Sequence, residues 1–261
     1  MGKITSALRK AADERIQRID KINKFRDKDQ FIVTRSKDSK VDPRIITYFD
    51  PKALITEQYK ILRTNILSLN KGKAPKTLVM TSSIHSEGKT ISAINLAVTF
   101  AYSVHKPKVL LIDADMRRGR VSRYLGIDTE AGLSEVLRGQ ADLSDTLFNI
   151  KIENLDFLAS GSVPENPAEL LSSDAMQTVL NKMRGQYDHI IIDTPPIIAV
   201  TDAGILGAKS DGVIMVVQAG RTQRGIVKRA KELLYQSHAK VLGHVLTNIE
   251  YHLPEYIYRY L

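Results

Sequence analysis

The sequence contains no cysteine. This absence excludes disulfide bonds, thiolate zinc sites and cysteine nucleophiles. No apolar stretch approaches the roughly 20 residues that a membrane-spanning helix needs, and the N-terminus lacks the apolar core of a signal peptide. We therefore expect a cytoplasmic protein. At 261 residues, the chain is long enough for one domain of roughly 200 residues with an extension.

Positive charge is concentrated near the N-terminus. Of the formal net charge of +9, residues 1–40 carry +6, from twelve Lys and Arg against six Asp and Glu. Apolar residues recur at helical spacing over residues 4–22, with Lys and Arg between them, which predicts a basic amphipathic helix. Such a helix suits an anionic membrane surface or an acidic partner, with nucleic acid less favoured. The alternative is a solvated charged helix. Residues 26–44 have the composition of a linker.

From residue 77 onward, apolar runs of strand length alternate with helical periods. This alternation is typical of βαβ units, so we expect an α/β fold with a doubly wound, mostly parallel sheet flanked by helices. Strands are expected at residues 78–82, 109–113, 155–159, 190–193, 213–218 and 241–247, and helices at 55–69, 89–103, 174–184 and 222–236, the last capped by Thr222. The expected organisation is a basic extension and linker at 1–50, the main domain at 51–250 and a tail at 251–261.

A phosphate-binding loop is predicted between the first of these strands and the helix after it, in the sequence Met-Thr-Ser-Ser-Ile-His-Ser-Glu-Gly-Lys-Thr. Such a loop presents backbone N–H groups and a helix N-terminus to phosphate, a lysine to the β- and γ-phosphates, and a hydroxyl to Mg²⁺. Gly88, Lys89 and Thr90 supply the end of this pattern. Ser83 replaces its first glycine, and Ser86 stands where glycine is common. The predicted nucleotide-binding residues here are Ser83, Ile84, His85, Ser86, Glu87, Gly88, Lys89, Thr90 and Ile91. The alternative is a helix start that binds no ligand.

Carboxylates follow two of the expected strands, and the carboxyl ends of strands are where such sheets bind ligands. Asp113 and Asp115 end the strand one crossover after the loop, and Asp193 ends a later apolar strand. A carboxylate there can hold Mg²⁺ directly or through water. The candidate catalytic residues are Lys89, Asp113, Asp115 and Asp193, and the candidate Mg²⁺ ligands are Thr90, Asp113, Asp115 and Asp193. An Asp at a strand end can instead cap a turn or a helix.

These motifs resemble those of the bacterial tyrosine kinases of capsular and exopolysaccharide systems, which use Walker motifs to bind ATP. The resemblance covers residues 50–261 and includes the loop, the Asn-Leu-Ala continuation at 95–97, the strand sequences Ile-Asp-Ala-Asp-Met-Arg and Ile-Ile-Asp-Thr-Pro-Pro, Asp202 and a Tyr-rich end. The Min/Par partitioning ATPases share several of these motifs. Their loop usually carries a second lysine where this chain has Ile84.

The resemblance implies a role for each candidate. Lys89 and Thr90 would bind phosphate and Mg²⁺, and Asp193 would organise the metal shell. Asp113 and Asp115 would divide metal binding and activation of the tyrosine hydroxyl between them, with Asp113 favoured as the base.

Two features of the motifs leave alternatives open. The family loop usually has Pro and Gly where this chain has His85 and Ser86, which affects the expected loop shape and nucleotide affinity. Asn248, at the end of the last expected strand, matches a position that contacts adenine in related proteins. Its alternative role is that of a turn residue.

Tyrosine is concentrated at the C-terminus, where Tyr251, Tyr256, Tyr258 and Tyr260 are four of the ten tyrosines. Pro254 and the alternating spacing argue against a packed helix. We therefore expect an accessible tail whose phenols serve as phosphoacceptors for another molecule. The alternative is an aromatic tail packed on a neighbour.

A candidate oligomer interface lies in the expected helix at residues 55–69. Glu57, Lys60 and Arg63 are three residues apart on one helical face. They resemble the E-x-x-R-x-x-R helix through which family members form rings, with Lys60 in place of the first arginine. Because lysine cannot form the same bidentate pair, a weaker ring is expected. The alternative is an exposed face with intrahelical pairs.

The leading hypothesis is an ATP- and Mg²⁺-dependent protein tyrosine autokinase that phosphorylates a neighbour's tail and regulates polysaccharide synthesis and export. The family implies a homo-oligomer, a separate transmembrane chain-length adaptor and a cognate tyrosine phosphatase, at the inner face of the cell membrane. One alternative is a Min/Par-like positioning ATPase that binds membrane or DNA and uses water as the nucleophile. Another is a catalytically weak scaffold.

Overall fold

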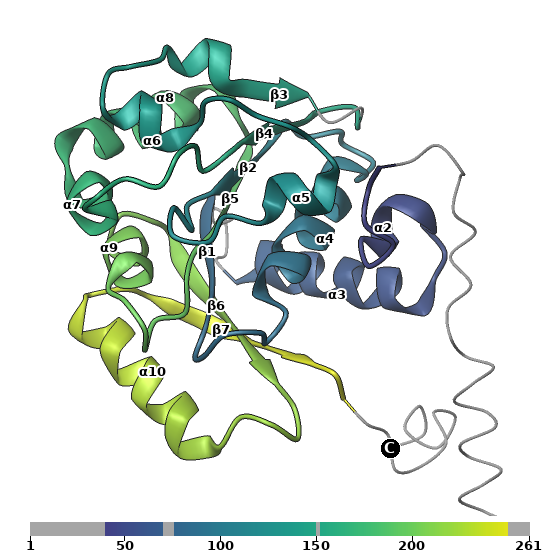
Figure 1. Ribbon diagram of the computed structural model, residues 1–261. Coiled ribbons are helices and arrows are strands. Elements are labelled where there is room, and N and C mark those ends of the chain that lie inside the picture. The colour runs from purple at the N-terminus through teal and green to yellow at the C-terminus, as the bar shows by residue number, and fades with distance from the viewer. Residues whose placement is uncertain (1–39, 70–75, 150–151, 250–261) are drawn as a thin grey trace, which may run out of the picture. The chain divides into compact units, whose positions relative to one another are not determined.

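The computed structural model describes residues 40–69, 76–149 and 152–249. Its strands are β1 (Thr77–Ser82), β2 (Val109–Asp113), β3 (Leu147–Asn149), β4 (Leu155–Leu158), β5 (His189–Asp193), β6 (Gly212–Gln218) and β7 (Val241–Thr247). They form one seven-stranded sheet in the order β3-β4-β2-β5-β1-β6-β7, with helices on both faces (Figure 1). All neighbouring strands are parallel except β3 and β4. The predicted doubly wound α/β fold is thus confirmed.

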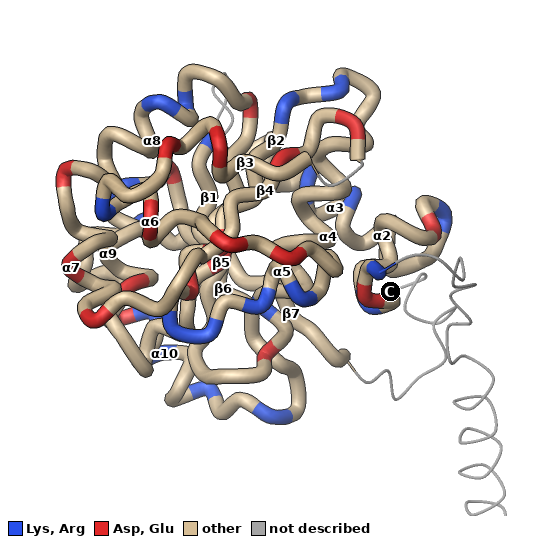
Figure 2. The backbone as a smooth tube through the Cα atoms, turned by 45° about the horizontal axis from the view of Figure 1, so that its top comes forward, with Lys and Arg blue, Asp and Glu red and all other residues tan. Residues whose placement is uncertain are grey.

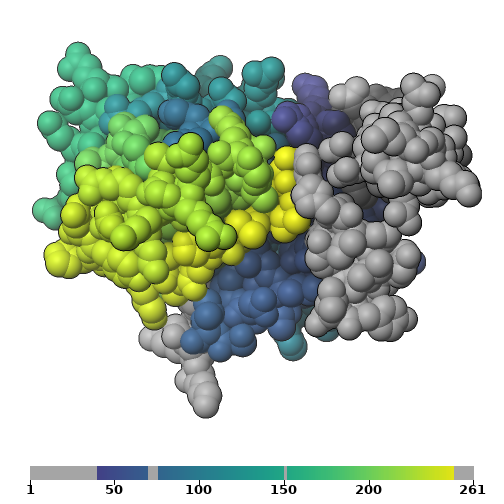
Figure 3. Space-filling view, turned by 90° about the horizontal axis from the view of Figure 1, so that it is seen from below, coloured from purple at the N-terminus to yellow at the C-terminus, as the bar shows by residue number. Residues whose placement is uncertain are grey.

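Two groups of helices cover the sheet. The helices are α2 (Ile46–Phe49), α3 (Leu54–Ser68), α4 (Lys89–Ala101), α5 (Val121–Leu125), α6 (Leu133–Leu137), the 3₁₀ helix η1 (Leu143–Thr146), α7 (Pro167–Ser172), α8 (Asp174–Gln186), α9 (Asp202–Ala208) and α10 (Arg224–Gln236). Apolar residues of α3, α4 and α5 share one buried cluster, and those of α6 to α10 share the other. The last described elements, α10 and β7, form a continuous surface on one side of the molecule (Figure 3).

The central strands contribute to both clusters because successive side chains of a strand point to opposite faces of the sheet. In β1, Val79 belongs to one cluster, and Leu78 and Met80 belong to the other. Every residue of β1 and of β2 is buried. Strands of a parallel sheet that is covered on both faces read as continuous apolar runs, and this is why the sequence predicts them so well.

The structure agrees with the six expected strands to within one residue at each end, and with the four expected helices to within two. Strand β3 was not expected, because three residues are too few to show a period. Five short helices were also not expected, because their four to seven residues are too few to show a helical period: α2, α5, α6, α7 and α9. The predicted Thr222 cap is wrong: α10 begins at Arg224 with Gln223 as its N-cap residue.

The folded unit begins before residue 51. Ile45 is fully buried. The backbone N–H and the hydroxyl of Thr47 donate to Asn95 Oδ1 of α4, at 3.1 and 2.9 Å. Asn95 Nδ2 in turn donates to the Arg44 carbonyl at 3.1 Å, so residues 44–47 contact α4, although the sequence had placed them in the linker and extension.

Two of the sequence expectations lie outside the described residues. These are the basic helix at 4–22 and the tyrosine tail at 251–261. Among the residues that the structure does describe, none of the helices combines the length and the apolar character that crossing a membrane requires.

Candidate active site

The loop of residues 83–88 joins β1 to α4 at the carboxyl edge of the sheet. Gly88 is the N-cap residue of α4 and has φ +89°, a conformation that glycine adopts without strain. Ser86 also lies in the left-handed region, at φ 65°, despite its side chain. Its carbonyl accepts a hydrogen bond from Arg221 at 3.0 Å. The loop therefore turns at Ser86 without a glycine.

The buried carboxylate of Glu87 holds this loop in place through hydrogen bonds. It is only 1% exposed, and its Oε2 accepts a hydrogen bond from the N–H of Ile84 at 2.7 Å. Its Oε1 accepts hydrogen bonds from the N–H of Gln218 at 3.2 Å and from the Thr222 hydroxyl at 2.5 Å. The Thr247 hydroxyl donates to the Glu87 carbonyl at 2.8 Å. The Glu87 side chain thus ties the loop to the end of β6, and a contact of Glu87 with nucleotide stays a prediction.

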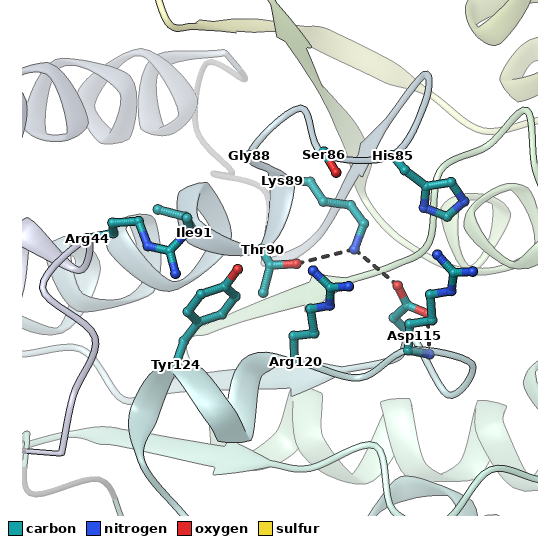
Figure 4. Close-up of a pocket in the computed structure, with 11 residues that line it drawn as sticks. Arg44, His85, Ser86, Gly88, Lys89, Thr90, Ile91, Asp115, Arg120 and Tyr124 are labelled. Atoms are coloured by element: carbon teal, nitrogen blue, oxygen red, sulfur yellow. Dashed lines mark hydrogen bonds and ion pairs between the residues drawn. The ribbon is translucent and has the colours of Figure 1, made fainter.

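Four side chains meet at the start of α4. Lys89 Nζ lies 3.2 Å from Asp115 Oδ2 and 3.4 Å from Asp193 Oδ2. The Thr90 hydroxyl donates to Asp193 Oδ2 at 2.7 Å, and Lys89 Nζ donates to Thr90 Oγ1 at 3.3 Å (Figure 4). The sheet brings these groups together because β1, β2 and β5 are parallel neighbours whose carboxyl ends share one edge.

Asp113 is part of the same cluster but is fully buried. Its Oδ1 accepts a hydrogen bond from the N–H of Asp115 at 3.1 Å, and its Oδ2 accepts one from the N–H of Val121 at 3.0 Å. Burial, together with the charge of Asp193, raises the pKa of Asp113 to about 7. Asp113 therefore titrates near neutral pH.

Burial and charge oppose each other at Lys89 and Asp193. Burial lowers the pKa of Lys89, but the carboxylates of Asp193, Asp115 and Asp113 outweigh it, so that the pKa is raised. Burial raises the pKa of Asp193, partly opposed by the positive charge of Lys89 and the hydrogen bond from Thr90. The lysine therefore stays charged at neutral pH, as a phosphate-binding group must.

Lys89, Thr90 and Asp115 line a cavity of about 260 Å³ (Figure 4). Its lining consists of Arg44, His85, Ser86, Gly88, Lys89, Thr90, Ile91, Asp115, Arg118, Arg120 and Tyr124. Seven of these residues are predicted site residues. Arg44, Arg118, Arg120 and Tyr124 are not. Arg118 and Arg120 follow a recognised motif directly, so their place in the sequence was a usable signal. Arg44 lies just before α2, and nothing in the sequence indicated that it lines this cavity.

Other predicted residues lie elsewhere. Ser83 is buried below the loop, and its hydroxyl has no hydrogen-bond partner among the described residues. Asn248 is exposed just after β7 at φ 53° and does not line the cavity. A contact of Asn248 with adenine therefore stays a prediction.

The candidate oligomer interface lies on α3, away from this cavity. Glu57 and Lys60 form an intrahelical ion pair at 2.7 Å, as the alternative interpretation expects. Lys60 Nζ also donates to the Pro51 carbonyl at 2.8 Å. Arg63 donates to the Thr99 carbonyl of α4 at 2.5 Å. Each of the two basic side chains already has a partner within the chain, and their role in assembly stays a prediction.

The oxygen atoms of the site fit Mg²⁺ that arrives with a nucleotide. Mg²⁺ in nucleotide sites is bound by one or two carboxylates together with substrate phosphates. Thr90 Oγ1 and Asp193 Oδ2 offer such ligands, and the Asp115 carboxylate faces the same cavity. Within the described ranges, no three His, Asp or Glu side chains are arranged to hold a metal ion by themselves. The predicted carboxylate set would thus need phosphate oxygens to complete it, and a direct role of the buried Asp113 as ligand stays a prediction.

Known proteins resemble the chain over most of its length. A family described as an AAA domain matches residues 77–238. The tyrosine-protein kinase YwqD of Bacillus subtilis is 38% identical over 212 residues, which are 81% of this chain and 89% of YwqD. The putative tyrosine-protein kinase CapB of Staphylococcus aureus is 35% identical over 213 residues, 82% of this chain and 92% of CapB.

Solved structures share the fold of this chain to different degrees. The chimerical protein CapA2B2 matches with a TM-score of 0.76 and 33% identity, covering 81% of this chain and 93% of that protein. A plasmid partition protein from Borrelia burgdorferi matches with a TM-score of 0.54 and 24% identity, over 72% of this chain and 87% of its own. The second likeness shows a common fold alone. Because the relatives at 35% and 38% identity are named tyrosine-protein kinases, the Min/Par-like alternative is not favoured.

Proposed function

Because the chain belongs to the bacterial tyrosine-protein kinases, we propose that it transfers the γ-phosphoryl group of ATP to a tyrosine hydroxyl of a second copy. The observation that carries this proposal is the meeting of Lys89, Thr90, Asp115 and Asp193 behind a loop that ends in a helix N-terminus, with the first three of these residues lining one cavity. Phosphoryl transfer depends mainly on positioning and on charge stabilisation, and this cluster offers both.

Each residue has a distinct part in the proposed site. Lys89 and the loop N–H groups bind the phosphate oxygens. Thr90 and Asp193 would hold Mg²⁺, which would offset the negative charge of the phosphates. The exposed side chain of His85 and that of Ser86 border the mouth of the cavity.

Asp115 is the better-placed base for the acceptor hydroxyl. It lines the cavity, whereas Asp113 is fully buried and both its oxygens accept backbone hydrogen bonds. We therefore assign proton removal to Asp115, in place of the role that the sequence favours for Asp113, and a positioning role to Asp113. The tyrosine oxygen bonds to the γ-phosphorus, its proton passes to Asp115, and the bond to the β–γ bridging oxygen breaks to release ADP.

The proposed acceptors are the tail tyrosines Tyr251, Tyr256, Tyr258 and Tyr260. They lie outside the described residues, and their number within so short a segment supports the proposal. The test is to incubate the protein with Mg²⁺ and γ-labelled ATP and to map phosphate by mass spectrometry. We expect phosphotyrosine in the tail of the wild type, and none in Lys89→Ala or when all four tyrosines are changed to Phe.

The outcomes of this test separate the alternatives. Release of phosphate without phosphotyrosine would favour a positioning ATPase, and no turnover at all would favour a scaffold. Retention of tyrosine phosphorylation in Lys89→Ala would contradict the assignment of the site.

Transfer between copies has a separate test. Lys89→Ala retains the tail but should lack activity, and a chain that ends at residue 249 retains the site but lacks acceptors. When the two are mixed with labelled ATP, label should appear on Lys89→Ala. If Lys89→Ala gains no label from the truncated chain, although the wild type labels its own tail under the same conditions, transfer occurs within one chain.

We further propose that this activity regulates exopolysaccharide or capsule synthesis and export at the inner face of the cell membrane. A separate transmembrane adaptor would activate the kinase, and a tyrosine phosphatase would reverse the modification. Residues 4–22 would contact anionic lipid. Cosedimentation with vesicles that contain anionic lipid should fall when residues 1–39 are deleted, and equal sedimentation would contradict the membrane contact.

A further inference from the structure

Two guanidinium groups lie at the mouth of the cavity. Arg118 and Arg120 line the cavity together with Asp115, and both are exposed. Within the described part of the chain, neither guanidinium forms an ion pair, although the adjacent Arg117 pairs with the buried Asp202 at 3.2 Å. Arg120 extends from the start of α5 toward the phosphate-binding loop (Figure 4). This pair can therefore bind an anion that enters the cavity from outside.

The backbone that carries the two arginines is held by the carboxylates of the site. Asp115 Oδ1 accepts a hydrogen bond from the N–H of Arg118 at 3.1 Å, and Asp113 Oδ2 accepts one from the first residue of α5 at 3.0 Å. Gly119 packs so closely on Ser160 and Asp113 that a Cβ there would overlap the Ser160 hydroxyl. The arginines are thus presented at a fixed place beside the reacting groups. Basic residues gather where the chain enters α5 (Figure 2), and no acidic residue lies between Arg117 and Arg123.

Guanidinium groups are suited to phosphate. Their planar donors bind two phosphate oxygens at once, and arginine clusters recognise phosphorylated motifs in many complexes. Lys89 serves the phosphates of ATP deep in the cavity. The two exposed arginines lie at its mouth, so they can bind a second phosphate group that belongs to another molecule.

The spacing of the tail tyrosines supplies such a phosphate. Tyr256, Tyr258 and Tyr260 alternate with other residues. In an extended bound segment, residues two apart point to the same side and are about 6.6 Å apart. When one tyrosine enters the cavity, a phosphate on the next would lie on the same side. Each phosphate adds about −1.5 to −2 charges to the tail, which strengthens its attraction to arginine.

We propose that Arg118 and Arg120 bind a phosphotyrosine two residues from the acceptor tyrosine, so that one phosphorylation of the tail promotes the next. This inference rests on the proposed function, because it requires that the tail is the substrate. It adds an outer phosphotyrosine subsite to the same cavity and predicts that the tail tyrosines are modified in succession rather than independently.

The test uses the full chain with its four tail tyrosines changed to Phe, so that it cannot modify itself at the tail. Synthetic peptides of residues 250–261 serve as acceptors, with Tyr258 as the acceptor, Phe at 251 and 256, and either phosphotyrosine or Phe at 260. We call the peptide with phosphotyrosine at 260 primed and the one with Phe at 260 unprimed. We expect kcat/KM to be about tenfold higher for the primed peptide, which is the size of effect that charge-assisted hydrogen bonds provide. A peptide with phosphotyrosine at 259, on the opposite side, should gain much less.

Variants of the kinase test whether the two arginines cause the preference for the primed peptide. In the double variant Arg118→Ala, Arg120→Ala, the ratio of kcat/KM between primed and unprimed peptides should fall to about one. Arg123→Ala removes an exposed arginine of α5 that does not line the cavity, and it should leave the tenfold ratio unchanged. Circular dichroism would check that each variant is folded.

Three results would overturn the inference. Equal use of both peptides by the parent chain would contradict priming while leaving the kinase activity intact. A double variant that is slower with every peptide but keeps its preference would place the arginines on the transferred phosphoryl group instead. If no tail peptide is phosphorylated at all, the proposed function fails, and the inference fails with it.

Discussion

At Ser86, a residue with a side chain occupies a left-handed backbone conformation, with φ 65°. Most residues other than Gly, Asn and Asp avoid this region, and β-branched residues avoid it most strongly. The strain is local to the phosphate-binding loop, where the carbonyl of Ser86 is held by Arg221. Backbone strain of this kind is often found at functional sites.

We expect Ser86→Val to lower the free energy of unfolding by about 1 to 2 kcal/mol relative to Ser86→Gly, because only the valine is strained at positive φ. Urea denaturation of the two variants measures the difference. Residue 86 is exposed, so lost packing cannot explain the difference. Equal stabilities would show that the loop relaxes to another conformation.

Glu87 has a structural role that differs from its predicted place among the nucleotide-binding residues. Its carboxylate satisfies three donors, from Ile84, Gln218 and Thr222. Glu87→Ala should lower the free energy of unfolding by about 2 to 4 kcal/mol, because a buried donor without a partner costs about 1 to 3 kcal/mol. Thr222→Ala removes one of these bonds and should cost about 1 kcal/mol. A Glu87→Ala variant as stable as the wild type would contradict this role.

The two carboxylates after β2 are expected to differ in their effect on the reaction. Asp115→Asn should reduce kcat by about 10² to 10⁴, the usual contribution of a general base. Asp113→Asn should reduce kcat less, because Asp113 acts through the backbone of Asp115 and α5. Single-turnover phosphorylation measures both rates. A larger loss in Asp113→Asn would return the role of base to Asp113.

At the scale of single elements, the N-terminus of α6 depends on one carboxylate. Glu135 accepts hydrogen bonds from the N–H of Gly132 at 2.8 Å and from Arg138 at 2.7 Å. The Ser162 hydroxyl donates to it at 2.5 Å. Burial raises the pKa of Glu135, but the hydrogen bonds from Ser162 and Gly132 outweigh burial and lower it to about 2. The carboxylate thus ties the short helix α6 to the loop after β4.

This lowered pKa predicts a pH dependence. A carboxyl group that binds its proton less tightly in the folded chain than in the unfolded chain stabilises the fold above the unfolded pKa, near 4.5. That contribution disappears as the pH falls from there through about 2. Glu135→Gln should therefore be less stable than the wild type at pH 7, by about 2 kcal/mol, and the difference should shrink below pH 4.

Denaturant unfolding between pH 7 and pH 3 measures this difference. The control is Glu153→Gln, since Glu153 forms only an exposed ion pair with Lys106 at 3.0 Å, and such pairs contribute little. A stability difference for Glu135→Gln that does not change with pH would show that the carboxylate charge is not its cause.

At the scale of the whole molecule, the question is how copies assemble. The helix α3 carries the predicted interface, but Lys60 and Arg63 are already bonded to Glu57 and Thr99 within the chain. An assembly through this face would have to exchange or share these bonds. It would also bring several tails together, and phosphorylation would add about −1.5 to −2 charges for each phosphate.

We expect phosphorylation to dissociate such an assembly through repulsion between tails. Light scattering before and after incubation with Mg²⁺ and ATP measures the mass, and Lys89→Ala treated in the same way is the control. Phosphorylation that leaves the mass unchanged would refute the link between modification and assembly.

The site could be predicted only where its residues belong to a local pattern. The phosphate-binding loop and the ends of β2 and β5 each place functional groups at a fixed offset from an apolar strand. Arg44 and Tyr124 lie in the same cavity but come from segments far apart in the sequence. The Arg44 guanidinium lies 5.0 Å from the centre of the Tyr124 ring. This contact depends on how the segment just before α2 packs against α5.

The sequence by itself determined the parallel sheet, the loop and the carboxylates at the strand ends, because apolar runs and their polar ends are local signals that burial imposes on each strand. Only the tertiary structure decided which of these groups face the cavity. It turned Glu87 inward, buried Asp113, and placed Asp115 in a cavity whose mouth is lined by Arg118 and Arg120. The physical reason is that side-chain direction and burial depend on what packs around a residue, and those neighbours are distant in the chain.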